Sequence, residues 1–220
     1  MTLDVFAICY NESVLLPYFV KHYQDMGANI TIYDNHSTDG SQDIIRAAGC
    51  NLIPYDSNGQ IRDDIYLEIK NNCWKTSKAD WVIVCDIDEF IVLPSDVSKC
   101  TMVALTGYDI VGMPPSKIGT PNKMYNKLAM FRPSQIQEIN YLAGCHYAKP
   151  VGNIIMSQYA GSLYHYKYIS EEYLVARHRM YRARLSEINK KHEWGKEYLV
   201  EENIIREKYR EVAKSAACLQ

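Results

Sequence analysis

The segment WVIVCDIDEFIVL, Trp81 to Leu93, places three acidic residues within a span of four between two runs of apolar side chains. The first run predicts a buried strand, because such strands in parallel sheets are nearly continuous in apolar residues. Residues two apart in an extended segment point the same way, so Asp86 and Asp88 are expected to share one side while Ile87 turns into the core. Ligands of parallel α/β sheets bind at the carboxyl ends of strands. The pair is therefore expected to emerge into a cleft.

The chain before this segment alternates between strand and helix patterns. Apolar runs predict strands, and apolar residues at helical spacing predict helices between them. The expected strands cover 3–10, 29–33, 50–54 and 81–87, and the expected helices cover 15–26, 42–48 and a segment carrying Ile65, Ile69 and Cys73. Four strands separated by three helices predict a three-layer α/β/α domain with a central, mostly parallel mixed sheet and a helical C-terminal tail.

Beyond Leu93 the pattern breaks into shorter strand-like pieces at 108–114, 127–133 and 153–159, which predict a mixed sheet forming one wall of the cleft. From Ser170 the chain turns helical and charged, breaks at Gly195 and continues as a helix to about Lys214. We expect a catalytic domain over 1–169, with a nucleotide-binding half at 1–95 and an acceptor-side half at 96–169. Residues 170–220 would form a helical extension packed on the same domain.

Composition places the chain among ordinary globular proteins, with 47% hydrophobic and 23% charged residues. A net charge of −2 predicts no general attraction to nucleic acid. The seven scattered cysteines form no C-x-x-C pair, which favours a reducing, cytoplasmic setting. The N-terminal sequence shows neither a signal peptide nor a transmembrane segment.

The basic stretch ARHRMYRARLSEINKKHEWGK, from Ala176 to Lys196, would suit peripheral contact with an anionic membrane or with a phosphorylated acceptor. A charged helical face is more often simply solvated. The sequence leaves these interpretations open.

Two carboxylates as close as Asp86 and Asp88 would repel each other and raise one pKa beside an apolar strand. A divalent cation such as Mn²⁺ or Mg²⁺ would neutralise them and would be placed to hold a diphosphate. The D-x-D spacing alone is common in proteins. Most of the evidence for a metal site therefore comes from the position of this pair at the end of the fourth strand.

Four sequence blocks resemble, in order and spacing, the GT-A nucleotide-sugar glycosyltransferases, and most closely a family-2-like branch with a D-x-D-E-F signature. The blocks are YNES at 10–13, YDNHSTDGS at 33–41, DWVIVCDIDEF at 80–90 and LYHYKYIS at 163–170. The resemblance covers about the first 95 residues and a short patch near His165. It implies transfer of a sugar, with inversion, from a UDP-sugar donor to a hydroxyl of a glycan or related acceptor, assisted by Mn²⁺ or Mg²⁺.

The resemblance also implies roles for single residues. Tyr10 would contact the base, Asp34 would accept the uracil imide N–H, and Arg62 would approach the diphosphate. Asp88 would be the direct metal ligand, with Asp86 near ribose and metal and His165 completing the site. The nucleotide-sugar set implied in this way is Cys9, Tyr10, Glu12, Asp34, Arg62, Asp86 and Ile87.

The general base is less well defined by the sequence. Its candidates are His146 and Glu138 in the acceptor-side region, with Asp109 and Glu171 as alternatives, and Glu89 is expected to orient the strand or the acceptor. His146 is favoured because LAGCHYAKP indicates a turn on the cleft side, where an imidazole can take up a proton near pH 7.

Each assignment has a structural alternative. Tyr10 would then only cover the sheet edge, Asp34 would cap the following helix, and Arg62 would pair with Asp63 or Asp64. At the level of function, a non-catalytic nucleotide-sugar or carbohydrate-binding module is the main rival. A haloacid-dehalogenase-like phosphatase is less favoured, because its D-x-D normally lies on an N-terminal strand. A nucleotidyltransferase would need a glycine-rich, basic phosphate loop, which CYNES does not supply.

Overall fold

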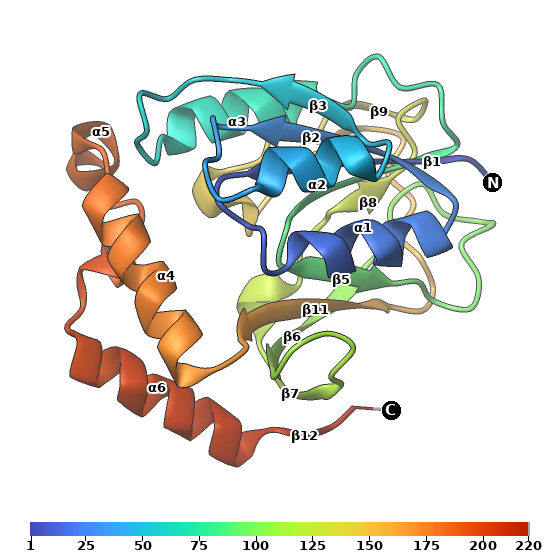
Figure 1. Cartoon of the computed structure of the whole chain (residues 1–220). Coiled ribbons are helices and arrows are strands. Elements are labelled where there is room, and N and C mark those ends of the chain that lie inside the picture. Colours follow the sequence, from blue (N-terminus) through green and yellow to red (C-terminus); the bar gives the residue numbers. More distant parts are fainter. Residues whose placement is uncertain (220) are drawn as a thin grey trace.

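The computed structural model describes residues 1–219 and contains two five-stranded sheets. The first has the order β3-β2-β1-β4-β8 (Figure 1). Four of its strands run parallel, and β8 pairs antiparallel to β4 at the edge. Their bounds are β1 Leu3–Cys9, β2 Ala28–Asp34, β3 Asn51–Pro54, β4 Trp81–Asp86 and β8 Met130–Phe131.

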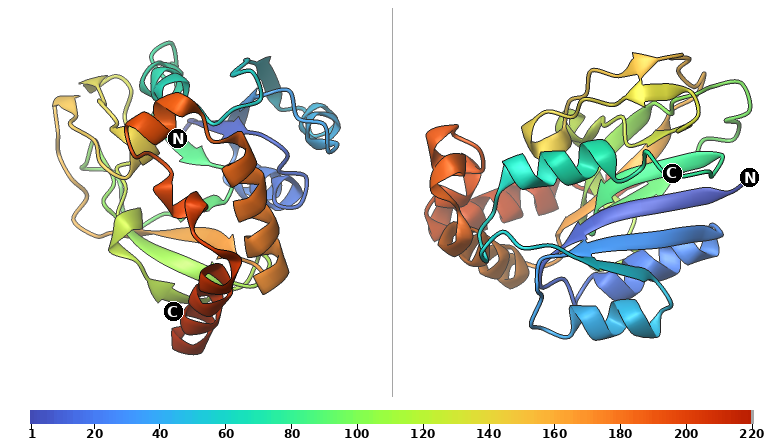
Figure 2. Two further views of the ribbon diagram at one scale, coloured as in Figure 1. Left: turned by 90° about the vertical axis from the view of Figure 1, so that its left-hand side faces the viewer. Right: turned by 90° about the horizontal axis from the view of Figure 1, so that it is seen from above.

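Helices cover both faces of this sheet. Helices α1, Leu16–Asp25, and α2, Ser41–Ala47, lie on one face, and α3, Asp63–Asn72, lies on the other (Figure 2). A proline in the first turn suits the start of α1, and Gly27, with φ of 75°, takes the left-handed conformation that ends it. The predicted α/β class with a mostly parallel central sheet is confirmed.

The second sheet has the order β12-β7-β6-β11-β5. Strand β11 lies parallel to β6 and antiparallel to β5, and the remaining pairs are antiparallel. The bounds are β5 Glu89–Val92, β6 Leu105–Val111, β7 Ile118–Pro121, β11 Gly161–Tyr168 and β12 Ala217–Cys218. Because β5 begins three residues after β4 ends, the acidic segment carries the chain from the first sheet to the second.

Short elements connect these sheets. They are β9 Ile136–Glu138, which pairs with β10 Val151–Gly152, and the 3₁₀ turns η1 Lys123–Tyr125 and η2 Ala143–Cys145. The prediction of a strand over 153–159 is wrong. Within the described chain that segment contributes only a single bridge, Met102 to Met156, and it leaves Ile154 and Ile155 exposed.

The C-terminal region is helical, as predicted. It consists of α4 Glu171–Arg184, α5 Glu187–Lys191, the 3₁₀ turn η3 Lys196–Leu199 and α6 Glu202–Ser215. Ser170 caps α4 by accepting the N–H of Tyr173. A cluster of buried residues joins β11, α4 and α6: Tyr168, Leu174, Val175 and Ile205.

In Figure 1 the helix α4 lies beside the carboxyl ends of β1 and β2. The division into 1–169 and 170–220 stays a prediction, and Gln220 lies outside the described residues. No helix within residues 1–219 combines the length and apolar character needed to cross a bilayer.

Tyr23 of α1 connects the main core to the acidic segment. Its ring is fully buried, and its hydroxyl donates to the carbonyl of Glu89 at 2.9 Å and accepts the N–H of Ile91 at 3.2 Å. This one side chain therefore fixes the start of β5 against α1.

We expect Tyr23→Phe to lower the free energy of unfolding by about 1–3 kcal/mol, because it leaves buried backbone groups of β5 without a partner. Urea denaturation followed by circular dichroism measures the change. Tyr18→Phe, at an exposed position of the same helix, is the matched control and should change stability little. Equal stability of the two variants would contradict this account.

Candidate active site

A cavity of about 580 Å³ lies at the carboxyl ends of the first sheet. Its wall comes from the end of β1, from α3, from residues 86–89, from β11 and from α4. In the left view of Figure 2 the C-terminal helices cross in front of the strand ends. The cavity therefore lies between the sheets and the C-terminal helices.

The acidic segment turns at the cavity floor, where its first and last carboxylates are paired with lysines. Asp86 is 2.6 Å from the Nζ atom of Lys70 and 3.6 Å from that of Lys127. Lys127 also lies 2.5 Å from Glu89, and both side chains are almost completely buried, at 3% and 1% exposure. Glu89 accepts the N–H of Asp86 through its other oxygen at 3.2 Å. Glu89 therefore braces the turn, and its expected role toward the acceptor stays a prediction.

These pairs change the pKa values in the directions that keep the groups charged. Burial alone would raise the pKa of Asp86, but Lys70 and Lys127 lower it. Burial alone would lower the pKa of Lys70 and of Lys127, but the nearby carboxylates raise both. The floor of the cavity is a charged network and not a set of neutral acids.

Asp88 enters a second network on the other side of the turn. Its Oδ2 lies 3.0 Å from Arg177 of α4 and 3.3 Å from the Nε2 atom of His165 on β11. Asp109 of β6 contacts the other ring nitrogen of His165 at 3.0 Å, and Tyr125 stacks on the ring with a centroid distance of 3.9 Å. The imidazole is thus fixed in position by three neighbours.

The electrostatics of this network favour ion pairing. Burial alone would raise the pKa of Asp88, but Arg177 and His165 hold it well below its usual range. Burial alone would lower the pKa of His165, but the carboxylates of Asp88 and Asp109 raise it. The two carboxylates therefore favour the protonated form of His165.

Asp88 and His165 also fit a divalent cation. A ligating histidine typically turns its second nitrogen to a carboxylate, which is the position of Asp109. Asp86 does not join them, because its carboxylate faces the two lysines. Within residues 1–219 no three His, Cys, Asp or Glu side chains converge on one point. The chain offers two ligands, which suits a cation that takes its remaining oxygens from water and diphosphate.

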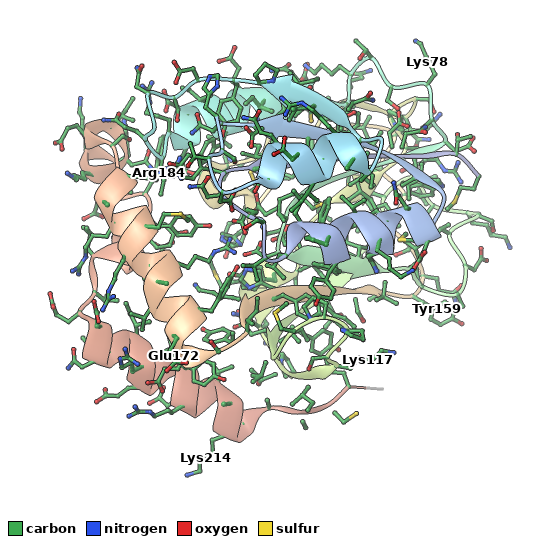
Figure 3. The ribbon with its side chains drawn as sticks, viewed as in Figure 1. Lys78, Lys117, Tyr159, Glu172, Arg184 and Lys214 are labelled. Carbon is green, nitrogen blue, oxygen red and sulfur yellow. The ribbon has the colours of Figure 1, made fainter. Side chains whose placement is uncertain are left out.

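Glu12 and Tyr10, both predicted for the nucleotide pocket, line the cavity. Glu12 is 3.0 Å from Arg177, so this arginine joins two carboxylates from different loops. Burial raises the pKa of Glu12 to about 7, although Arg177 opposes the shift. The ring of Tyr10 is covered by the guanidinium of Arg184, 3.1 Å from the ring centroid. Figure 3 labels Arg184 at the end of α4.

Four predicted residues lie outside the cavity wall: Cys9, Asp34, Arg62 and Glu138. Cys9 is fully buried in the core. Asp34 is also fully buried and accepts from Ser37 and Gln42, so its contacts are those of a local brace. Arg62 pairs with Asp64 at 2.6 Å, and Glu138 pairs with Lys75 at 2.7 Å on the surface. Ile87 is buried in the core below the turn and contributes to the cavity floor.

His146 is the base candidate that the structure brings to the cavity. Its Nδ1 atom lies 2.9 Å from the carbonyl oxygen of Met124, which can only accept, so Nδ1 carries the proton and Nε2 is left as the basic nitrogen. Asp109 also lines the cavity but is engaged by His165 and Asn122. Glu171 is held on the surface by Arg206 and Arg210.

The sequence analysis missed the cations of this site: Lys70, Lys127, Arg177 and Arg184. The sequence did contain a pattern that could have pointed to Arg177. It lies four residues from both Tyr173 and Tyr181 and so shares a helix face with two aromatic residues. The sequence indicated its charge only as part of a basic stretch, either solvated or in contact with an anionic membrane or a phosphorylated acceptor. Lys70 and Lys127 carry no pattern in the sequence that separates them from surface lysines.

Comparisons with known proteins give no family assignment. No protein-family model matches the chain, and no curated protein sequence matches it. Among solved structures, S. aureus TarS 1-349 aligns with a TM-score of 0.46 at 13% identity, over 84% of this chain and 65% of that chain.

Two further structures align over shorter ranges. The mannosyltransferase PcManGT from Pyrobaculum calidifontis, in complex with GDP-Man and Mn²⁺, has a TM-score of 0.38 at 13% identity, over 59% of this chain and 44% of that chain. Glucosyl-3-phosphoglycerate synthase from Mycobacterium tuberculosis, in complex with Mn²⁺, UDP and glucosyl-3-phosphoglycerate, has a TM-score of 0.35 at 12% identity, over 48% and 44%. The chain spans less than two thirds of the length of each of these three structures.

We expect His146 to titrate with a pKa of about 4, well below the ordinary value of 6.5, because burial and the charge of Lys127 disfavour the imidazolium. The unfolded chain binds this proton more readily, so His146 should make the fold less stable as the pH falls from 6.5 toward about 4. The Cε1–H resonance of His146, assigned with His146→Asn, measures the midpoint by NMR. A midpoint at or above 6.5 would contradict the burial argument.

Proposed function

We propose that this chain is a metal-assisted glycosyltransferase that moves a sugar from a UDP-sugar to a hydroxyl of a glycan or related acceptor. The observation that carries the proposal is the contact of Asp88 with an oriented His165 inside the cavity at the end of β4. The position of Tyr10 in the same cavity supports it. These residues belong to the blocks that resemble the GT-A enzymes.

The donor nucleotide would enter beside Tyr10. A nucleobase stacked on an aromatic ring gains about 1–3 kcal/mol, and the ring face of Tyr10 is covered by the planar guanidinium of Arg184. In this proposal the nucleobase displaces the guanidinium of Arg184 from the face of Tyr10. Arg184 then remains at the rim of the cavity as a cation. The uracil contact once expected of Asp34 is not part of the proposal, because that carboxylate is fully buried.

Asp88 and His165 would hold the cation, which would neutralise negative charge on the departing diphosphate. Arg177 keeps a second carboxylate partner, Glu12, at 3.0 Å and so remains in the cavity when Asp88 is shared. Lys70 and Lys127 would favour the ionised form of Asp86, and the Lys127–Glu89 pair would hold the turn in place.

The chain's own part in the transfer is the handling of one proton. A bond forms between the acceptor oxygen and the anomeric carbon while the bond from that carbon to the diphosphate oxygen breaks, and the nucleoside diphosphate leaves with the electron pair. The acceptor's proton passes to the Nε2 atom of His146, whose Nδ1 is already engaged by Met124. Attack opposite to the leaving group inverts the anomeric centre.

The test is calorimetric titration of UDP with and without Mn²⁺, on the original chain and on Asp88→Asn. We expect metal-dependent binding that weakens at least about tenfold in the variant, because one of two protein ligands is lost. Asp96→Asn, an exposed acid outside the cavity, is the matched control and should bind as the original chain does.

Hydrolysis of a panel of UDP-sugars then separates an enzyme from a binding module. Slow, Mn²⁺-dependent release of UDP that His146→Asn reduces supports catalysis. Absence of UDP binding under every condition would overturn the donor assignment, and tight binding without turnover toward any acceptor would favour the binding module.

A further inference from the structure

A second group of basic side chains lines the cavity away from the acidic turn. It consists of Lys167 on β11, His178 on α4 and Lys208 on α6. The three residues come from three elements, all C-terminal to residue 160, that pack around one buried cluster. The convergence is therefore produced by the tertiary fold and not by one charged helix.

Lys167 and Lys208 lack the carboxylate partners that Lys70, Lys127 and Arg177 have. Lys70, Lys127 and Arg177 each pair with one or more carboxylates. In the part of the chain that the structure describes, neither Lys167 nor Lys208 forms an ion pair. Unpaired positive charge in a concave, partly dry site focuses a field that attracts anions.

His178 adds an independent observation. Its side chain contributes to the cavity wall at only 7% exposure, and its buried Nδ1 atom has no hydrogen-bond partner within residues 1–219. Burial and then the charges of Lys167, Lys208 and Arg177 lower its pKa to about 4, so the ring is neutral. A buried polar ring left unsatisfied among cations costs free energy unless a ligand compensates it.

The acidic neighbours do not cancel this charge. Asp88 and Asp109 lie near Lys167, but both are already engaged with His165, and Asp88 also with Arg177. Glu197 of η3 lines the same part of the cavity without forming an ion pair among the described residues. The carboxylate of Glu197 is thus set against two lysines, beside the neutral ring of His178.

We propose that Lys167, His178 and Lys208 form a subsite for a phosphate group carried by the acceptor. This inference rests on the proposed transferase function and names its acceptor class as a phosphate ester. A phosphate offers several acceptor oxygens and up to two negative charges, which suits two ammonium groups and an imidazole better than a neutral sugar would. The donor's diphosphate is assigned to Asp88, His165 and Tyr10, which line the same cavity.

Lys208→Gln tests the subsite, because Lys208 is exposed on α6 and its loss should not disturb folding. Lys214→Gln is the matched control on the same helix, and Figure 3 shows Lys214 extending away from the rest of the molecule. The probe is glycerol 3-phosphate, titrated at constant ionic strength and followed by the Cε1–H resonance of His178. Saturating UDP and diamagnetic Mg²⁺ fill the donor site during the titration.

We expect glycerol 3-phosphate to shift the His178 resonance, glycerol to leave it unchanged, and Lys208→Gln to weaken the phosphate ester about tenfold, as for loss of one charge-assisted hydrogen bond. The UDP affinity of the variant should equal that of Lys214→Gln. Equal binding of glycerol 3-phosphate by the two variants would overturn the subsite.

Two further outcomes separate this inference from the proposed function. A parallel loss of UDP affinity in Lys208→Gln would assign the cluster to the donor's diphosphate and overturn the acceptor role. If UDP binds neither variant nor the original chain, the titration without UDP decides: Lys208-dependent binding of glycerol 3-phosphate then supports the phosphate subsite while the transferase function fails.

Discussion

The fold depends on neutralising three carboxylates at the junction of its two sheets, of which Asp88 and Glu89 are buried and Asp86 is partly exposed. Asp86, Asp88 and Glu89 leave β4 and enter β5 within four residues. An isolated charge in such a place costs several kcal/mol, so each carboxylate needs a cation from elsewhere in the chain. Those cations come from α3, from the segment after η1 and from α4: Lys70, Lys127 and Arg177. Three distant elements must therefore dock at one point, and the cavity is the space they enclose.

This requirement also determines how the site can accept a further cation. Asp86 pairs with both Lys70 and Lys127, whereas the buried Glu89 pairs with Lys127 alone, so removal of Lys127 would leave a buried charge unpaired. Asp88 is different, because its partner Arg177 has a second carboxylate in Glu12. A metal cation could therefore replace Arg177 as the partner of Asp88, because Arg177 would still be paired with Glu12. Two of the three carboxylates thus serve the structure, and the proposed metal site uses the third.

Much of the first sheet could be predicted from the sequence because its signals are local. Apolar runs and helical spacing placed β1 to β4 and α1 to α3 to within about two residues, and the position of the acidic turn followed from strand order. The segment 153–159 failed because an apolar run alone does not say whether it meets a sheet or solvent. Because Ile154 and Ile155 are exposed, they bury too little apolar surface to stabilise strand pairing along this segment.

The site was less predictable from the sequence, because residues of the same type differ in their tertiary contacts, and these contacts determine which of them reach the cavity. Asp34 and Asp88 are both acids at the ends of parallel strands, yet one is enclosed by Ser37 and Gln42 while the other faces the cavity. Arg62 and Arg177 are both arginines on helices, and only the second reaches the acidic turn, 89 residues away in the chain. Neither difference is visible in spacing or composition.

The cavity as a whole is divided between opposite charges. The proposed metal site uses Asp88 and His165 at the acidic turn, and the proposed anion site uses the unpaired Lys167 and Lys208. Arg177 lies at the boundary, since it contacts Asp88 and also adds to the positive field at His178. Two phosphate-bearing substrates placed side by side would repel each other in a site of low dielectric. A divalent cation at one end, the lysines at the other and a guanidinium between them are what such a pair of substrates requires.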